Sequence, residues 1–233
     1  MKLSIIIPAY NEEDYVRTIL NRVKKAKLPS GVRKEIIIVN DGSTDSSKFK
    51  VQSSKLQFKI KNLKTISYKK NMGKGYAIRQ GLKKATGDYV LIQDADLEYD
   101  PNDYGNLLKP VLEKKAQVVY GSRFLGERRN MFFWHMLGNK LLSLLTNLLY
   151  NTTLSDMEVG YKVIPRNLLK SLNLKEDRFG FEPEVTAKIL KRKIRIYEVP
   201  ISYSGREFDE GKKITWRDGV KAVFYLFKYR FMD

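Results

Sequence analysis

The segment Tyr89-Val-Leu-Ile-Gln-Asp94-Ala-Asp96-Leu-Glu98-Tyr-Asp-Pro101 joins a short apolar run to a dense group of carboxylates. The run from Tyr89 to Ile92 has the length and composition of a buried strand. Asp94 and Asp96 follow it closely, and ionised carboxylates are costly to bury without a partner. The end of this strand should therefore meet a cation, a hydrogen-bonding ligand or open water. A hard divalent ion such as Mg²⁺ or Mn²⁺ is one such partner, and an ordinary acidic turn is the alternative.

Similar apolar runs recur through the first half of the chain and alternate with helix-like segments. This alternation predicts βαβ units, and hence an α/β fold with a mostly parallel sheet flanked by helices. We expect strands at Leu3–Pro8, Glu35–Asn40, Lys64–Tyr68, Tyr89–Gln93 and Gln117–Gly121. We expect helices at about Glu12–Ala26, Ser46–Gln57, Gly75–Ala85 and Asn102–Lys114.

The second half is less regular and shows no linker or strong domain boundary. At 233 residues the chain can bury one substantial core, so we predict a single domain over residues 1–233. A strand is expected near Arg195–Val199. Helical patterns lie near Trp134–Tyr150, Pro165–Ser171, Glu182–Lys191 and Thr215–Tyr229.

Polar clusters follow several of the expected strands, at Ala9–Glu12, Asn40–Asp45 and Asp94–Asp96. The carboxyl ends of parallel strands meet at one edge of a sheet, where ligands usually bind, so these clusters should form one site. Lys74, at the start of an expected helix, should lie near a phosphate group. The glycines around it fit neither a Walker loop nor a dinucleotide fingerprint.

Composition narrows the choice of partners. Lys and Arg number 44 against 26 Asp and Glu, and the net charge of +18 favours a polyanionic partner. No nucleic-acid reader motif is present, so we do not expect a nucleic-acid partner. The chain has no cysteine and one histidine, His135. A metal would therefore be held mainly by oxygen atoms, which favours Mg²⁺ or Mn²⁺ over zinc.

Six short motifs follow one another along the chain. They are Pro8-Ala-Tyr-Asn-Glu12, Val39-Asn-Asp-Gly-Ser-Thr-Asp45, Asn71-Met-Gly-Lys-Gly75, Asp94-Ala-Asp96, Gly121-Ser-Arg123 and Asp156-Met-Glu-Val-Gly-Tyr-Lys162. In this order they resemble the family 2 glycosyltransferases, most closely the dolichyl-phosphate mannose synthases and related polyprenyl-phosphate glycosyltransferases. The resemblance implies a Rossmann-like fold of the GT-A type, a nucleotide-diphosphosugar donor and Mg²⁺ or Mn²⁺.

The same resemblance assigns roles to single residues. Asp41 matches the carboxylate that reads the base, Asp94 the acid beside the ribose and sugar, and Asp96 the metal-binding acid. Glu98 stands where the mannose synthases tend to have Gln as a second metal ligand, a change that keeps an oxygen atom and adds charge. The residues that match the loop at the nucleoside are Pro8, Ala9, Tyr10 and Glu12.

Basic residues match the family's phosphate contacts. Arg123 resembles a contact to the acceptor or donor phosphate. Arg206 with Lys212 or Lys213 resembles a segment that closes over the diphosphate, because Arg can clamp phosphate with two hydrogen bonds and Lys adds charge on a mobile stem. The candidate catalytic residues are Asp94, Asp96, Arg123 and Arg206.

These assignments predict a metal-dependent, inverting transfer of a hexose from GDP-mannose or UDP-glucose to a dolichyl or undecaprenyl phosphate. The phosphate oxygen of such an acceptor is already an anion, so no strong base is needed. A glycan hydroxyl is the alternative acceptor and calls for a base, with Asp156 as the candidate. Residues 1–125 would form the nucleotide-sugar-binding half, and residues 126–233 the acceptor half.

Two segments point to contact with a membrane. The apolar run Met131–Tyr150 contains too many polar residues for a membrane span, and Trp216–Phe231 mixes aromatic residues with Lys and Arg. Both suit amphipathic helices in the interface of an anionic membrane; burial in the core or in a dimer contact is the competing explanation. The N-terminal apolar run is too short for a secretory signal. We expect a cytoplasmic protein that binds peripherally to the cytoplasmic face of the membrane.

Overall fold

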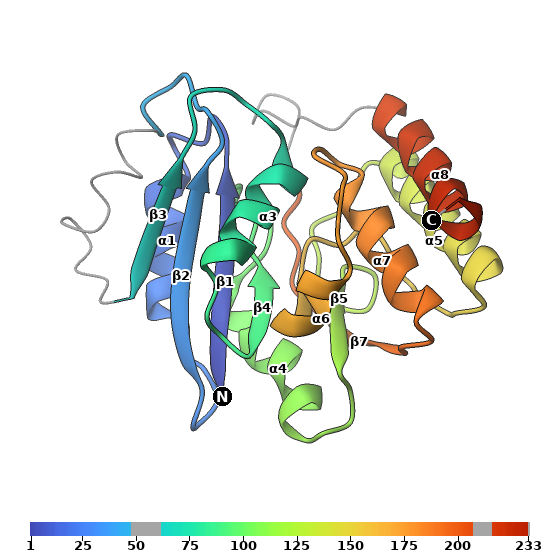
Figure 1. The fold of residues 1–233 in the computed structure, drawn as a ribbon, viewed down its shortest axis with the longest axis horizontal. Coiled ribbons are helices and arrows are strands. Elements are labelled where there is room, and N and C mark those ends of the chain that lie inside the picture. The colour runs from blue at the N-terminus through green and yellow to red at the C-terminus, as the bar shows by residue number, and fades with distance from the viewer. Residues whose placement is uncertain (48–61, 207–215, 233) are drawn as a thin grey trace.

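The computed structural model of the protein describes residues 1–47, 62–206 and 216–232. The strands in these residues are β1 Lys2–Ala9, β2 Arg33–Asn40, β3 Leu63–Ser67, β4 Tyr89–Ile92, β5 Val118–Ser122, β6 Lys162–Pro165 and β7 Ile196–Pro200. They form one sheet in the order β3-β2-β1-β4-β6-β5-β7 (Figure 1). Only β6 runs antiparallel to its neighbours among the described strands. The prediction of a mostly parallel sheet is confirmed.

Helices cover both faces of this sheet. The described helices are α1 Val16–Lys25, α3 Lys74–Lys84, α4 Tyr104–Leu112, α5 Phe133–Tyr150, α6 Arg166–Ser171, α7 Phe181–Lys191 and α8 Trp216–Phe231, with a 3-10 turn at Pro101–Asp103. In Figure 1, α1 lies behind the sheet and α3 in front of it, whereas α5 and α8 lie side by side at the far edge and pack on α7. Most of the helix expected at Ser46–Gln57 lies outside the described residues.

The core follows the continuous apolar runs of the central strands. Ile5 to Ile7 in β1 and Ile36 to Val39 in β2 are buried throughout, as are Val90 to Ile92 in β4. Strands with helices on both sides have no solvent face, so every side chain along them can be apolar. The polar residues that follow these strands are therefore held at the edge of the sheet, where the site forms.

Two elements differ from the sequence-based expectation. The first helix begins at Val16 and not at Glu12, because the backbone N–H groups of Tyr15 and Val16 both donate to the Glu12 carbonyl and close a turn before the helix. β6 was missing from the prediction. It is a short strand that contains a buried lysine, Lys162, whose ammonium donates to the carbonyl oxygens of Met157 and Val159.

The buried carboxylate of Glu35 in β2 forms hydrogen bonds and ion pairs with residues of the neighbouring strands β1 and β3. Glu35 is 2% exposed and accepts hydrogen bonds from the Ser4 hydroxyl at 2.6 Å and from the Thr86 backbone at 2.6 Å. The ammonium groups of Lys2 and Lys64 lie 2.9 and 3.0 Å from it. Burial alone would raise the pKa of the Glu35 carboxyl, but these hydrogen bonds and cations outweigh it and hold the pKa well below the ordinary value of 4.5.

Replacing Glu35 with Gln should lower the free energy of unfolding at pH 7 by about 1–3 kcal/mol, because buried donors lose a charged acceptor. The depressed pKa fixes the sign of the pH dependence. The contribution of Glu35 is complete above pH 4.5 and is lost as the pH falls towards the pKa of the folded protein. Urea unfolding at several pH values should show the gap between wild type and variant closing below pH 4.5. The exposed-site control Glu127→Gln should show no such gap, and a pH-independent gap for Glu35→Gln would contradict the argument.

Candidate active site

The carboxyl ends of β1 and β4 bring acids from distant parts of the chain to one guanidinium. Nη1 of Arg206 lies 3.2 Å from Glu12 Oε2, and Nη2 lies 3.5 Å from Asp96 Oδ2. Nε of Arg206 lies 3.9 Å from Glu98 Oε1. These four residues, called the acid cluster below, join segments that are 194 residues apart in the chain. Two of the three predicted polar clusters, those after β1 and β4, therefore meet at one sheet edge through Arg206.

Glu98 organises the segment that carries Arg206. The backbone N–H of Arg206 donates to Glu98 Oε1 at 2.9 Å, and the Tyr203 hydroxyl donates to Oε2 at 3.1 Å. The backbone N–H of Ser204 donates to the Glu98 carbonyl at 2.9 Å. Both carboxylate oxygens of Glu98 thus accept hydrogen bonds from residues 203–206, which places the Arg206 side chain over the acids.

The surroundings of Asp96 in the acid cluster disfavour the ionised form of its carboxyl group. Burial, together with the neighbouring charges of Glu98 and Asp94, raises the pKa of its carboxyl to about 8 despite the opposing effect of Arg206. The negative charges of Glu98 and Asp94 around Asp96 therefore outweigh the positive charge of Arg206. Asp96 and Glu98 offer hard oxygen donors that fit Mg²⁺ or Mn²⁺, and such an ion can take its other positions from water and a ligand. The described residues contain no group of three or more His, Cys, Asp or Glu side chains able to hold a metal by themselves.

Asp94 is held by the ammonium group of Lys74, which also contacts Glu182. The Lys74 ammonium lies 2.8 Å from Asp94 Oδ1 and 2.8 Å from Glu182 Oε1. Burial opposes the charge on Lys74, but the two carboxylates outweigh it and raise its pKa well above the ordinary value. A Cβ atom on Gly160 would overlap Asp94 Oδ2 and would lie 3.1 Å from Tyr99 Cε2, so only glycine lets the chain pass this close to the acid.

The loops after β1 and β2 are held against each other. The backbone N–H of Glu12 donates to the Ser47 hydroxyl at 2.9 Å. Asp41 is 2% exposed, and its carboxylate accepts from the backbone N–H groups of Met72 at 3.0 Å and Gly73 at 2.6 Å. Asp41 thereby fixes the loop that begins α3 and presents Lys74. Its reading of a base remains a prediction, as do the nucleoside contacts of Pro8, Ala9 and Tyr10, which lie at the end of β1 or directly after it.

Arg123 lies beside this site in a buried ion pair. Its Nε donates to Asp156 Oδ2 at 2.7 Å, and its Nη2 donates to Oδ1 at 2.7 Å. The Arg123 backbone N–H also donates to Oδ2, at 3.0 Å. Asp156 is fully buried and Arg123 is 8% exposed, and the guanidinium lies 5.4 Å from the centre of the Tyr203 ring. The phosphate contact predicted for Arg123 stays a prediction, and Lys212 and Lys213 lie outside the described residues.

The sequence patterns gave no role to two further acids, the buried Glu182 and the partly exposed Glu158. Glu182, at the start of α7, is 4% exposed and completes the contacts of Lys74. Burial and the nearby charge of Glu182 raise the pKa of Glu158 to about 8, and Glu158 Oε1 is buried with no hydrogen-bond partner. The available signal was the position of Glu182 between Phe181 and Val185 in an apolar helix, where an acid must be paired to be buried.

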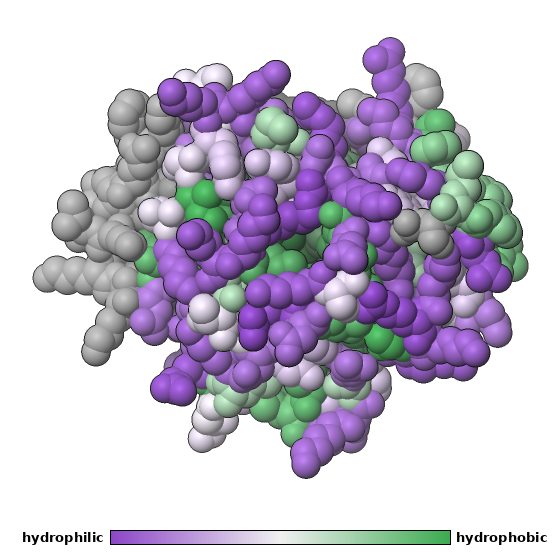
Figure 2. Space-filling view, in the orientation of Figure 1, coloured by the Kyte–Doolittle hydropathy of each residue, from purple (hydrophilic) through white to green (hydrophobic). Residues whose placement is uncertain are grey.

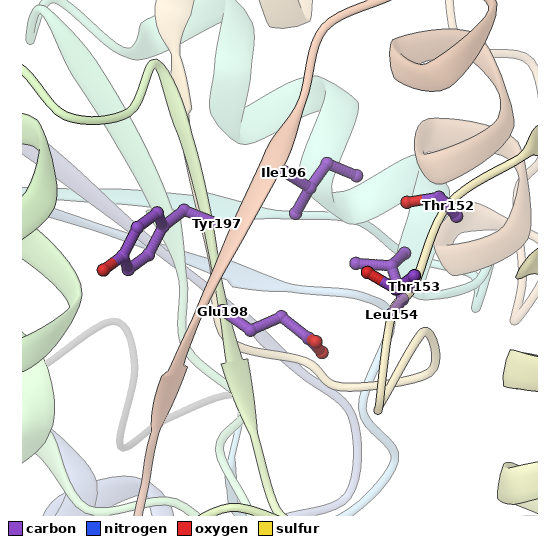
Figure 3. A pocket seen from close by; sticks show the side chains of 6 residues that line it. All are labelled: Thr152, Thr153, Leu154, Ile196, Tyr197 and Glu198. Carbon is purple, nitrogen blue, oxygen red and sulfur yellow. The ribbon is translucent and has the colours of Figure 1, made fainter.

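A separate open pocket of ≈ 200 Å³ lies away from the acid cluster (Figure 3). Figure 3 shows Glu198 reaching from β7 towards the chain around Leu154. The Glu198 carboxylate accepts from the backbone N–H groups of Ser155, at 2.9 Å, and Asp156, at 3.1 Å. Its role is to hold the loop that presents Asp156. The lining residues are Thr152, Thr153, Leu154, Ile196, Tyr197 and Glu198.

The curated proteins that match nearly the whole chain include two dolichyl-phosphate glycosyltransferases. A UDP-N-acetylglucosamine--dolichyl-phosphate N-acetylglucosaminyltransferase from Methanococcus voltae is 29% identical over 240 residues, covering 95% of this chain and 93% of the relative. A dolichyl-phosphate beta-glucosyltransferase from Trichomonas vaginalis is 29% identical over 241 residues, covering 97% of this chain and 72% of the relative.

A solved structure shares the fold. The crystal structure of glucosyl-3-phosphoglycerate synthase from Mycobacterium tuberculosis, in complex with Mn²⁺, UDP and glucosyl-3-phosphoglycerate, superposes with a TM-score of 0.73 at 20% sequence identity. The match covers 98% of this chain and 79% of that chain. The Rossmann-like GT-A architecture expected from the sequence is therefore confirmed.

The family model described as glycosyl transferase family 2 matches residues 4–172. This range begins within β1, extends past β6 and includes the acids Asp94, Asp96 and Glu98. The chain therefore belongs to glycosyl transferase family 2 and is a glycosyltransferase.

Proposed function

We propose that the enzyme moves a hexose from a nucleotide-diphosphosugar to a polyprenyl phosphate and requires Mg²⁺ or Mn²⁺. The observation that carries this proposal is the acid cluster beside the Asp94–Lys74 pair, at the sheet edge where the donor should bind. Both curated relatives are named for transfer to dolichyl phosphate, and the solved structure is named for a complex with Mn²⁺ and UDP. These names support the proposed substrate classes and metal.

The metal would be held by Asp96 and Glu98, and a bound divalent ion supplies positive charge that stabilises the diphosphate leaving group. The chain's own residues do the positioning. Lys74 fixes the carboxylate of Asp94 so that it can orient the donor sugar. Arg206 already contacts the acids and can turn its guanidinium to a diphosphate. Lys212 or Lys213, outside the described residues, would add positive charge.

The environment of Asp156 favours a phosphate acceptor over a sugar hydroxyl. A hydroxyl must lose a proton to a base in the transition state. Asp156 is fully buried and accepts three hydrogen bonds from Arg123, so it is poorly placed to take up a proton. A phosphate acceptor is already ionised and needs only to be brought to the anomeric carbon, which is a matter of orientation and charge.

A donor screen tests the proposal. Purified protein is incubated with undecaprenyl or dolichyl phosphate, Mg²⁺ or Mn²⁺, and labelled UDP-glucose or GDP-mannose in parallel. We expect one donor to place label in the organic phase as a lipid-linked sugar. Label that reaches only a soluble glycan acceptor would favour the alternative acceptor, and no transfer with any donor and lipid phosphate would contradict the proposal.

We also propose peripheral binding to the membrane through α5 and α8. The buried residues of α5 are polar, Ser143 and Thr146. Its exposed leucines are Leu141, Leu144 and Leu148, and Leu148 is 74% exposed. Figure 2 shows apolar residues gathered at the edge of the molecule where these helices lie. No helix of the described residues is long and apolar enough to cross a membrane. A helix that buries polar side chains and exposes leucines suits the interface of a lipid bilayer.

Flotation with anionic liposomes checks this binding. Leu144→Ser with Leu148→Ser should reduce the bound fraction at low salt, since exposed apolar area on α5 is lost. Leu112→Ser on α4 is the matched control for an exposed leucine elsewhere and should bind as wild type does. Equal binding of all three proteins, or no binding of the wild type, would contradict the proposed surface.

Replacing Gly160 with Ala should reduce kcat about tenfold to a hundredfold, because the new methyl group displaces Asp94 from its position beside Lys74. The overlap should also cost stability, about 1–3 kcal/mol for an overpacked site. Steady-state kinetics and urea unfolding measure both effects. Gly105→Ala is the matched control, because nothing lies within 4 Å of a Cβ atom at that position. A wild-type kcat in Gly160→Ala would show that the position of Asp94 does not matter.

A further inference from the structure

Two positive charges lie against one phenyl ring beside the candidate active site. The Lys140 ammonium lies 3.8 Å from the centre of the Phe124 ring, and the Arg128 guanidinium lies 5.7 Å from it. The ring face attracts cations but carries no net charge. Among the described residues neither side chain forms an ion pair, and Nη1 of Arg128 donates to the carbonyl oxygens of Arg123 at 3.4 Å and Phe124 at 3.3 Å. Within the part of the chain that the structure describes, the two charges thus have no counter-ion and suit an anion.

The position of Arg128 links this pair to the acid cluster. Arg128 forms an isolated parallel bridge with Tyr203, and the backbone N–H of the next residue donates to the Tyr203 carbonyl at 2.9 Å. The hydroxyl of the same Tyr203 donates to Glu98 at 3.1 Å. One side chain, that of Tyr203, therefore separates the Arg128 backbone from the acids assigned to the donor and metal.

The position of Lys140 links the pair to the apolar surface. Lys140 lies in α5, whose first turn exposes Trp134 and whose middle exposes Leu141 and Leu144. A ligand with an anionic head at Lys140 and Arg128 could lay a hydrocarbon chain along this side of α5. The chemistry that fits both neighbours is an amphiphile with a phosphate head.

We propose that Arg128 and Lys140 bind the phosphate group of the polyprenyl phosphate acceptor. The inference rests on the proposed function and names residues that the family motifs leave without a role. Arg123, whose carbonyl oxygen accepts from Arg128, already has its charge matched by Asp156. Arg128 can hold two phosphate oxygens through its planar guanidinium, and Lys140 adds a second charge on a flexible stem. Between them the phosphate faces the acid cluster, with its lipid chain towards α5.

The test measures KM separately for the two substrates in detergent micelles, where vesicle binding plays no part. Arg128→Gln and Lys140→Gln should each raise KM for polyprenyl phosphate about tenfold, the equivalent of one charge-assisted hydrogen bond. Their kcat and their KM for the nucleotide sugar should stay within about twofold of wild type. Lys170→Gln on α6 is the matched control, because it removes an exposed positive charge from a helix outside the proposed site and the proposed membrane surface.

The outcomes separate this inference from the proposed function. If the wild type transfers sugar to polyprenyl phosphate and both variants keep its KM, the inference is wrong and the proposed function stands. If both variants lose binding to anionic vesicles that lack polyprenyl phosphate but keep KM in micelles, the residues bind lipid headgroups and the inference is also wrong. If the wild type transfers nothing to polyprenyl phosphate, both proposals fail. A selective rise in the acceptor KM supports the inference.

Discussion

Replacing Asp96 with Asn should reduce sugar transfer about a hundredfold to a thousandfold, the scale on which loss of one electrostatic stabiliser of a transition state is felt. Asn keeps the shape of the side chain and one oxygen atom but removes the charge that would bind a divalent ion. The fold should survive. Burial and the charges of Glu98 and Asp94 already disfavour the ionised form of Asp96, so a neutral side chain relieves repulsion in the unliganded protein.

The matched control lies at the other end of the same strand. Asp88, just before β4, accepts a hydrogen bond from the backbone N–H of Lys2 at 2.8 Å and is far from the acid cluster along β4. Asp88→Asn should keep wild-type kcat with the same requirement for Mg²⁺ or Mn²⁺. Turnover and thermal unfolding of both variants are compared under identical conditions. Near-normal, metal-dependent turnover in Asp96→Asn would remove Asp96 from the proposed metal site.

Replacing Asp156 with Ala should lower the free energy of unfolding by about 3–5 kcal/mol, because it leaves the buried Arg123 guanidinium without its counter-ion. For a chain of this size each kcal/mol corresponds to a shift in Tm of about 2–4 °C, so Tm should fall by about 6–20 °C. Urea and thermal unfolding of wild type and variant measure the effect.

The double variant Arg123→Met with Asp156→Leu is the informative partner of that experiment. Apolar side chains of similar size remove the desolvation cost of both charges, so this protein should recover much of the stability lost in Asp156→Ala. Sugar transfer need not recover with it. If Asp156→Ala has the same free energy of unfolding as the wild type, the buried Arg123–Asp156 ion pair does not stabilise the fold and the argument is contradicted.

The central strands were predictable because local pattern and tertiary environment agree in them. β1 and β2 each contain an unbroken buried apolar run, Ile5 to Ile7 and Ile36 to Val39, as expected of strands that are covered on both faces. β6 was not predictable for the opposite reason. It spans only Lys162–Pro165 and begins with a charged residue, whose burial depends on carbonyl oxygens supplied by the preceding loop. Nothing local distinguishes such a segment from a turn.

The candidate site likewise has one part that the sequence predicts and another that it does not. The meeting of Glu12 with Asp96 follows from topology, because parallel strands deliver their carboxyl ends to one edge. Strand topology does not specify which cation pairs with each acid. Lys74 joins Asp94 and Glu182, and Arg206 enters the acid cluster from the far end of the chain, through contacts that only the packed structure specifies. The pairing of Arg123 with Asp156 likewise needs tertiary geometry.

The central claim is that the acid cluster supports metal-dependent sugar transfer to a lipid phosphate. The most direct measurement incubates wild-type protein with the labelled donor and polyprenyl phosphate, with Mn²⁺ in one arm and excess EDTA in the other, and counts label in the organic phase. We predict label in the organic phase with Mn²⁺ and background counts with EDTA. Equal lipid-linked label in both arms would contradict the claim, as would label that never leaves the aqueous phase.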